Sequence, residues 1–303
     1  MTHPPTYLIT GAGGGAGGIS TRVVRQLLDR GEAVRALVHR QDSRADALRA
    51  WGAEVIVGDL TNPVDVGAAM FGVTRMFFNM SVSPDYLEAT AVVWVAAQEG
   101  DGLDVLVNMS QMTVSQMTAT STEESHQQRL HWLAEHVINW SGIPAVHIRP
   151  TVFLDNPLFT VAAARSIRDT GRLALPFGTG RTSPVAASDV ADVVTTVLRS
   201  SDGHPGAVYE LTGPAALDVD ELAEQYAAAL DRPVAAVRLS YDQWLAQLGE
   251  SGLDPHVQDH IATMVRLHRD DRYNRFTRDV EDVTGHSAQT VRQYVAENRD
   301  LFA

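Results

Sequence analysis

Residues 7–18 read Tyr-Leu-Ile-Thr-Gly-Ala-Gly-Gly-Gly-Ala-Gly-Gly, an apolar run that leads directly into a glycine-rich segment. Residues 19–28 then carry apolar side chains at helical spacing, so the stretch predicts a strand, a tight turn and a helix. Glycine suits this turn because backbone N–H groups approach a pyrophosphate closely only where no Cβ intervenes, and the helix N-terminus adds positive charge. We interpret the turn as the pyrophosphate site of a dinucleotide; the alternative is a merely flexible glycine-rich loop.

Two glycine spacings fit this interpretation. The general fingerprint G-x-G-x-x-G is met by Gly13, Gly15 and Gly18. A variant that begins Thr-Gly-Ala is met by Thr10, Gly11, Gly14 and Gly17. The apolar segment 33–38 supplies the second strand of a βαβ unit where the fingerprint requires one.

The end of that second strand carries the signal for the cofactor. Dinucleotide sites that prefer NAD have an acidic residue about 20 residues past the glycines, whereas an arginine there accommodates the 2′-phosphate of NADP. His39 and Arg40 hold this position, so we expect NADP, with NADPH preferred over NADH and Arg40 as the phosphate contact. Two alternatives stay open: Arg40 is a solvated surface residue, and Asp42 nearby permits NAD.

Asp59 and Leu60 follow the predicted third strand at 54–57. The carboxyl ends of strands form the edge at which open α/β sheets bind ligands, so Asp59 is expected to accept a hydrogen bond from the adenine amino group. Its alternative role is to cap the helix that begins near Pro63.

Strands and helices alternate regularly as far as Pro150, which predicts an α/β fold with a doubly wound parallel sheet of the Rossmann type. We place an NAD(P)-binding domain at 1–150 and a smaller C-terminal α+β substrate lobe, interleaved with the sheet, at 151–303. Three capping patterns are expected to begin helices: Ser121-Thr122-Glu123-Glu124, Ser188-Asp189 and Asp218-Val219-Asp220-Glu221.

The composition excludes several classes of protein. A net charge of −13 argues against a nucleic-acid-binding surface, and the absence of cysteine removes disulfides and thiolate catalysis. The longest apolar run, at 91–97, is far shorter than the ~20 residues of a membrane span. The N-terminus has no secretory pattern, so we expect a cytoplasmic protein without membrane contact, compatible with a monomer or a homodimer.

Several further motifs accompany the glycine turn, Arg40 and Gly58-Asp59-Leu60. They are Ser141-Gly142-Ile143-Pro144, the run 149–156, Ser188-Asp189-Val190-Ala191, Leu211-Thr212-Gly213-Pro214 and Thr284-Gly285. Together these motifs, spread along the whole chain, resemble the NmrA-like family of atypical short-chain dehydrogenases. The family includes NADPH-dependent reductases of quinones, dyes and plant phenolics, and dinucleotide-binding regulators with little or no catalysis. Fold and cofactor therefore transfer better than activity.

The resemblance also implies roles for individual residues. Thr10 to Gly17 hold the pyrophosphate and Arg40 the 2′-phosphate. Met80 and Ser81 lie along the cofactor near its nicotinamide half, and Pro150, Thr151 and Val152 border the nicotinamide. Ser110 ends the strand that carries the catalytic serine of typical members.

One departure from that family pattern affects catalysis. Typical short-chain dehydrogenases place a Tyr and a Lys four residues apart on the next helix, but here Gln127 and His131 hold those positions. Glutamine is no general acid, which argues against a Tyr-based proton relay. His131 either contacts the nicotinamide ribose in place of Lys or is itself the acid, oriented by Glu135. The alternative is a surface histidine paired with Glu135.

Apolar side chains near the strand ends predict a pocket for an aromatic substrate, with Met112, Phe153 and Phe177 as candidates; core packing is the alternative. His256 and His260 lie at i,i+4 without a third ligand, so no metal site is expected. We expect an oxidoreductase that transfers hydride from NADPH to a small aromatic or conjugated carbonyl or quinone. The alternative is a non-catalytic NADP(H) sensor that acts through a protein partner.

Overall fold

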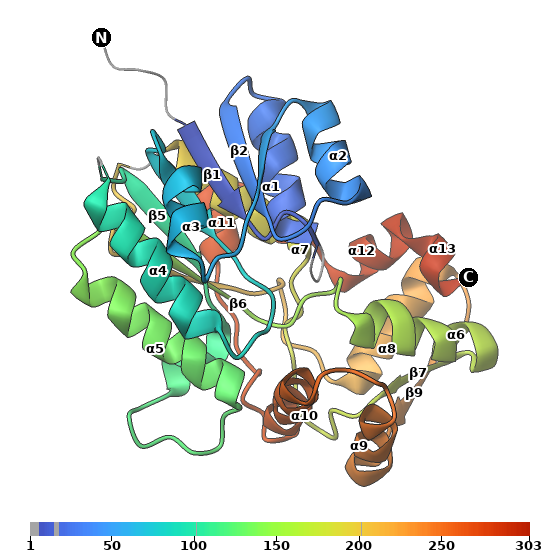
Figure 1. Ribbon diagram of the computed structural model, residues 1–303. Helices are drawn as coiled ribbons and strands as arrows, with labels where there is room; N and C mark the ends of the chain where they lie inside the picture. The colour runs from blue at the N-terminus through green and yellow to red at the C-terminus, as the bar shows by residue number, and fades with distance from the viewer. Residues whose placement is uncertain (1–5, 15–17, 101, 201) are drawn as a thin grey trace.

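The computed structural model describes residues 6–14, 18–100, 102–200 and 202–303. Its centre is a seven-stranded sheet in the order β3-β2-β1-β4-β5-β6-β8, in which all neighbouring strands are parallel (Figure 1). The strands are β1 (Thr6–Thr10), β2 (Ala33–Val38), β3 (Glu54–Val57), β4 (Arg75–Phe78), β5 (Val105–Met109), β6 (Ala145–Pro150) and β8 (Val208–Leu211). The strand order reverses between β1 and β4, where such sheets bind ligands. The predicted doubly wound fold is confirmed.

Helices cover both faces of this sheet. One face carries α1 (Ile19–Leu28), α2 (Ser43–Trp51), α7 (Ala187–Arg199) and α11 (Asp279–Thr284); the other carries α3 (Pro63–Met70), α4 (Tyr86–Glu99) and α5 (His126–Trp140). Side chains of β1 alternate between the two layers, with Tyr7 and Ile9 in one core and Leu8 in the other. Both faces are therefore buried, as a parallel sheet requires.

A second group of elements forms a lobe beyond the carboxyl ends of the strands (Figure 1). It has its own core around a two-stranded parallel sheet, β7 (Arg172–Leu175) with β9 (Ala235–Arg238). Its helices are a π-helix (Leu158–Ala163), α6 (Ala164–Thr170), α8 (Val219–Leu230), α9 (Tyr241–Gly249), α10 (Pro255–Arg269), α12 (Val291–Glu297) and α13 (Arg299–Phe302). Between them the chain returns to the sheet through α7 and β8, so lobe and sheet are interleaved in sequence.

Helix capping differs from the expectations at two places. The capping box of α5 is made by Ser125 and Gln128, not by residues 121–124: Ser125 Oγ accepts the Gln128 N–H at 3.2 Å, and Gln128 Oε1 accepts the Ser125 N–H at 2.8 Å. The first turn of α7 is capped from a distance by Asp155, which accepts the Ala187 N–H at 2.9 Å. Asp189 instead accepts the Gln289 N–H at 2.8 Å. The pattern at 218–221 does cap α8, as predicted.

The helices among the described residues include none that is long and apolar enough to cross a membrane.

Candidate cofactor and substrate site

The glycine turn after β1 is locked to the end of β4. Gly11 has φ 71°, and a Cβ there would lie 2.7 Å from the carbonyl oxygen of Asn79. Thr10 Oγ1 donates to that oxygen at 2.8 Å and accepts the Asn79 N–H at 2.9 Å, while Asn79 Nδ2 donates to Ser20 Oγ at 2.9 Å. The absence of a side chain at Gly11 therefore lets the turn, β4 and the start of α1 meet closely. Gly15 and Gly17 lie outside the described residues.

A cleft of about 480 Å³ opens beside this turn. Its lining contains the predicted cofactor residues Gly11, Gly13, Gly14, Arg40, Asp59, Leu60, Met80 and Ser81. The sequence reasoning missed Arg44, which also lines the cleft: a Cβ on Gly14 would lie 2.5 Å from its Nη1. Asp42 accepts hydrogen bonds from Arg44, and this lowers the pKa of the partly exposed Asp42 carboxyl to about 2. The sequence did contain a signal for this residue, because Arg44 is a second arginine only four residues after Arg40.

Asp59 does not cap the following helix. Asn62 does so, by accepting the Val64 N–H at 3.0 Å. Asp59 accepts hydrogen bonds from the backbone and hydroxyl of Thr61, both at 2.8 Å, and these bonds lower the pKa of its carboxyl. The alternative role considered for Asp59 is therefore wrong.

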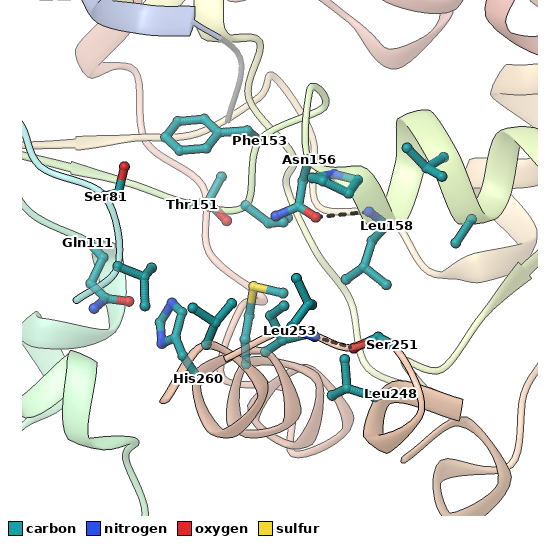
Figure 2. Close-up of a pocket in the computed structure, with 18 of the residues that line it drawn as sticks. Ser81, Gln111, Thr151, Phe153, Asn156, Leu158, Leu248, Ser251, Leu253 and His260 are labelled. Atoms are coloured by element: carbon teal, nitrogen blue, oxygen red, sulfur yellow. Dashed lines mark hydrogen bonds between the residues drawn. The ribbon is translucent and has the colours of Figure 1, made fainter. Parts of the chain in front are cut away.

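A larger cavity of about 1020 Å³ continues from the glycine turn toward the lobe (Figure 2). It brings together the predicted residues Met80, Ser81, Ser110, His131, Pro150, Val152 and Phe153. In its outer part, Leu158 of the π-helix lies opposite Leu248 and Leu253 (Figure 2). Val161 and Trp244 add apolar surface to the lining from the lobe, while Arg165, Asp169 and Ser251 add polar and charged groups.

Two residues predicted to line the pocket are packed in the core instead. Phe177 is fully buried, and its ring stacks on His268 at a centroid distance of 4.1 Å. Met112 is 1% exposed in a short 3-10 helix. Neither belongs to the cavity lining, so for these two the core-packing alternative holds.

His131 lies at the inner end of the cavity, with its ring against the Tyr86 ring at a centroid distance of 4.2 Å. Burial, and next the nearby His260, lower the pKa of His131 to about 3. At neutral pH it is therefore an uncharged imidazole, which makes it a poor general acid. Glu135 does not orient it, because both Glu135 oxygens accept hydrogen bonds from Arg149, at 2.9 and 2.5 Å.

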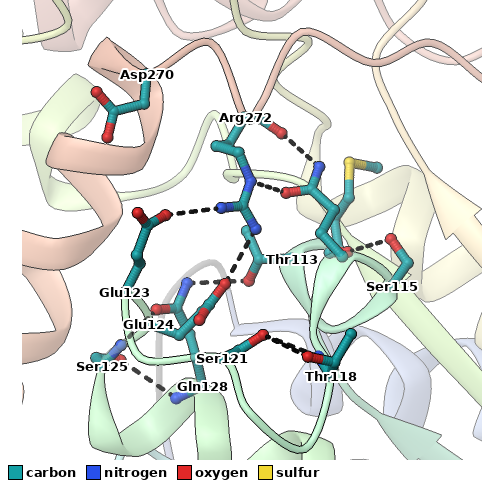
Figure 3. Close-up of polar contacts among 12 residues, drawn as sticks. Thr113, Ser115, Thr118, Ser121, Glu123, Glu124, Ser125, Gln128, Asp270 and Arg272 are labelled. Atoms are coloured by element: carbon teal, nitrogen blue, oxygen red, sulfur yellow. Dashed lines mark hydrogen bonds and ion pairs between the residues drawn. The ribbon is translucent and has the colours of Figure 1, made fainter.

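The two other histidines near this wall are hydrogen-bonded to α5. His260 Nδ1 lies 3.0 Å from Ser125 Oγ, and His256 Nε2 lies 2.8 Å from Gln127 Oε1. Figure 3 shows what holds this end of α5: Arg272 pairs with Glu124 at 3.0 Å. The start of α5 is thus fixed against the segment that follows α10.

Three buried polar atoms of the cavity residues have no hydrogen-bond partner in the described part of the chain. They are Gln111 Nε2, His131 Nδ1 and Thr151 Oγ1. Buried polar groups are almost always satisfied, so atoms of this kind in a cavity wall point to a ligand with polar groups of its own. The Ser110 hydroxyl interacts with Glu135. Burial raises the pKa of the Glu135 carboxyl, but hydrogen bonds from Arg149 and, to a smaller extent, the Ser110 hydroxyl lower it, and the pKa is lowered overall.

Comparison with known proteins agrees with this geometry. A family model described as NAD(P)H-binding matches residues 14–201. An NAD(P)H azoreductase of Xenophilus azovorans is 29% identical over 291 residues, which is 95% of this chain and 97% of the relative. A (4-alkanoyl-5-oxo-2,5-dihydrofuran-3-yl)methyl phosphate reductase of Streptomyces griseus is 28% identical over 296 residues, covering 98% and 99%.

Solved structures share the fold over nearly the whole chain. The NADPH-dependent quinone oxidoreductase of Escherichia coli complexed with NADPH has a TM-score of 0.81 at 22% identity, covering 97% of this chain and 99% of that one. NmrA, a negative transcriptional regulator solved with NADP, has a TM-score of 0.78 at 14% identity, covering 98% and 95%.

Proposed function

This chain belongs to the NAD(P)H-binding family, and we propose that it is an NADPH-dependent reductase of small aromatic or conjugated carbonyl compounds and quinones. The observation that carries the proposal is the continuous cavity, which runs from the glycine turn into the lobe past three buried polar atoms that have no partner among the described residues. The azoreductase and the dihydrofuranylmethyl phosphate reductase, both similar to this chain over nearly its whole length, support reductase chemistry.

The residues present fit a nicotinamide dinucleotide. Gly11 and Gly14 line the cleft where a pyrophosphate would lie; Gly11 lets the turn close against Asn79, and Gly14 lets Arg44 approach the turn. Arg40 and Arg44 offer cations for a 2′-phosphate. Beyond them, the inner end of the large cavity, whose lining includes Ser81 and Val152, would hold the nicotinamide. When bound there, the reduced coenzyme supplies a hydride. The lobe supplies the outer wall of the cavity.

The chain's own residues constrain how the product is protonated. The sequence contains 24 arginines and no lysine, so it cannot form a Tyr-x-x-x-Lys pair. His131 is uncharged at neutral pH. We therefore assign the final proton to water, which favours acceptors whose developing negative charge is delocalised or hydrogen-bonded.

The cofactor assignment is tested by titrating NADPH and NADH into Arg40→Ala and Arg44→Ala. Hydrogen bonds between charged groups contribute about 1.5–3 kcal/mol, so each loss should weaken NADPH by about 10- to 100-fold and NADH much less. Arg129→Ala, an exposed change on α5, is the control. Equal losses for both coenzymes would refute the phosphate assignment.

A second candidate is an NADP(H) sensor, which the NmrA fold likeness and the missing proton donor favour. Stopped-flow absorbance with NADPH and a panel of quinones, enones and azo dyes separates the two. Oxidation well above background supports the reductase, whereas tight NADPH binding without turnover of any acceptor supports the sensor.

A further inference from the structure

Gln127 is a buried side chain on the first turn of α5, and its orientation is fixed by a backbone donor. It is 1% exposed, and its Oε1 accepts the Ser83 N–H at 3.1 Å. A backbone N–H only donates, so the atom it contacts is the amide oxygen. His256 Nε2, at 2.8 Å from the same oxygen, is a second donor. The other end of the amide is therefore the NH₂ group.

That NH₂ group determines the tautomer of His131. Gln127 Nε2 lies 3.2 Å from His131 Nε2, and an amide nitrogen only donates, so His131 Nε2 accepts. A neutral imidazole that accepts at Nε2 carries its proton on Nδ1. Among the described residues His131 Nδ1 has no hydrogen-bond partner, and the atom is buried, while the His131 side chain is part of the cavity lining. The Nδ1–H is therefore a donor left unsatisfied by the protein beside the inner cavity.

The ring that carries this donor is held from a second side. Tyr86 packs its ring on His131, and the Tyr86 hydroxyl donates to the Met109 carbonyl at 2.9 Å. Ser83, which orients Gln127, follows Met80 and Ser81 on the loop after β4 that lines both cavities. One amide therefore connects the coenzyme loop to the imidazole.

We infer that Gln127 is a positioning residue that keeps His131 as a neutral Nδ1–H donor to the carbonyl oxygen of the acceptor, which makes carbonyl compounds and quinones the substrate class. The inference rests on the proposed reductase function. The acceptor carbon takes a hydride, the C=O π electrons move onto oxygen, and the Nδ1–H of His131 stabilises the resulting negative charge. The proton stays on His131, and water protonates the oxygen.

The tautomer is tested without turnover. In ¹⁵N-histidine-labelled protein at pH 7, free of coenzyme, imidazole NMR should show His131 neutral with its proton on Nδ1, assigned by the signal lost in His131→Phe. In Gln127→Leu the Nε2–H form should appear. A wild-type His131 protonated on Nε2 or on both nitrogens would overturn the inference, and this spectrum decides even if the leucine variant does not fold.

The donor role is tested by comparing two acceptors. Reduction of a quinone places negative charge on oxygen, whereas a cationic triphenylmethane dye takes hydride at carbon and forms no oxyanion. Removal of one oxyanion donor lowers kcat by about 10²–10³-fold, so His131→Phe should lower the quinone-to-dye ratio of kcat by about 100-fold at similar KM. Gln127→Leu should lower it by about tenfold, the value of one hydrogen bond.

Arg129→Gln, an exposed neighbour on α5, should leave this ratio unchanged. Equal losses for quinone and dye in His131→Phe would overturn the donor role even if the tautomer is as inferred. If the wild type oxidises NADPH with neither acceptor, the proposed function fails, and with it the catalytic role of His131. The NMR result then still reports whether Gln127 fixes the tautomer.

Discussion

Mild acid should destabilise this protein well above the pH at which carboxylates titrate. Burial lowers the pKa of His268 to about 3, and its side chain is 0% exposed between the rings of Phe177 and Tyr273. His131 and His260 have pKa values lowered to about 3 and about 4. Both line the cavity, where solvent reaches part of their surface.

The size of the effect follows from proton linkage. An unfolded histidine takes up a proton near its ordinary pKa of 6.5, while the folded form stays neutral down to about pH 3–4. The unfolded state therefore binds more protons between these values, and stability is lost as the pH falls through 6.5. At pH 5.0 the loss is about 2 kcal/mol for His268, and about 6 kcal/mol if all three contribute fully. This is comparable with the whole stability of a typical domain.

Urea unfolding followed by tryptophan fluorescence between pH 7.5 and 5.0 measures this loss, and His268→Phe provides the internal check. Phenylalanine keeps the ring stack and removes the titrating group, so the pH dependence of the unfolding free energy between 6.5 and 5.0 should become shallower by about 1 kcal/mol per pH unit. A wild type whose unfolding free energy is constant over this range, or a variant with an unchanged slope, would refute the reasoning.

Two further changes test the framework of the site. Gly11→Ala should lower the unfolding free energy by about 2–3 kcal/mol, because a Cβ at positive φ is strained and would collide with the Asn79 carbonyl. Gly13→Ala is the control: its Cβ would meet only Val38, at 3.7 Å, so it should cost under about 0.5 kcal/mol. Equal losses for the two variants in urea unfolding would contradict this reasoning. Glu135→Ala should cost about 3 kcal/mol, the lower end of the range for breaking a buried pair, because Arg149 loses its bidentate partner and keeps only Glu210 at 3.7 Å. A thermal melt unchanged from wild type would show the Glu135–Arg149 pair to be dispensable.

The glycine turn and the strand alternation made the sheet predictable from sequence. Both depend on local chemistry: apolar strands of a parallel sheet are continuous runs, and the turn needs glycine wherever Cβ would collide. The capping of α8 was predictable for the same reason, since Asp218 and Glu221 lie within one turn of each other.

The parts that escaped prediction depend on contacts between distant segments. Asp155 caps α7 from 32 residues away, and Phe177 is turned into the core by His268 of α10. The prediction that Glu135 orients His131 was wrong because Glu135 accepts hydrogen bonds from Arg149 of β6 instead. From the sequence, Gln127 could be interpreted only as the replacement of a catalytic tyrosine. The orientation of its amide depends on the hydrogen bond from the Ser83 N–H, a contact across 44 residues of chain.

Binding of the coenzyme by the folded wild-type chain is the most direct test of the account. Isothermal titration calorimetry with NADPH should give saturable binding at one site per chain, weaker with NADH and lost when Gly14, whose Cβ would meet Arg44, is replaced by Val. A folded protein that takes up neither coenzyme would contradict the assignment of the glycine turn and the reductase and sensor proposals that depend on it.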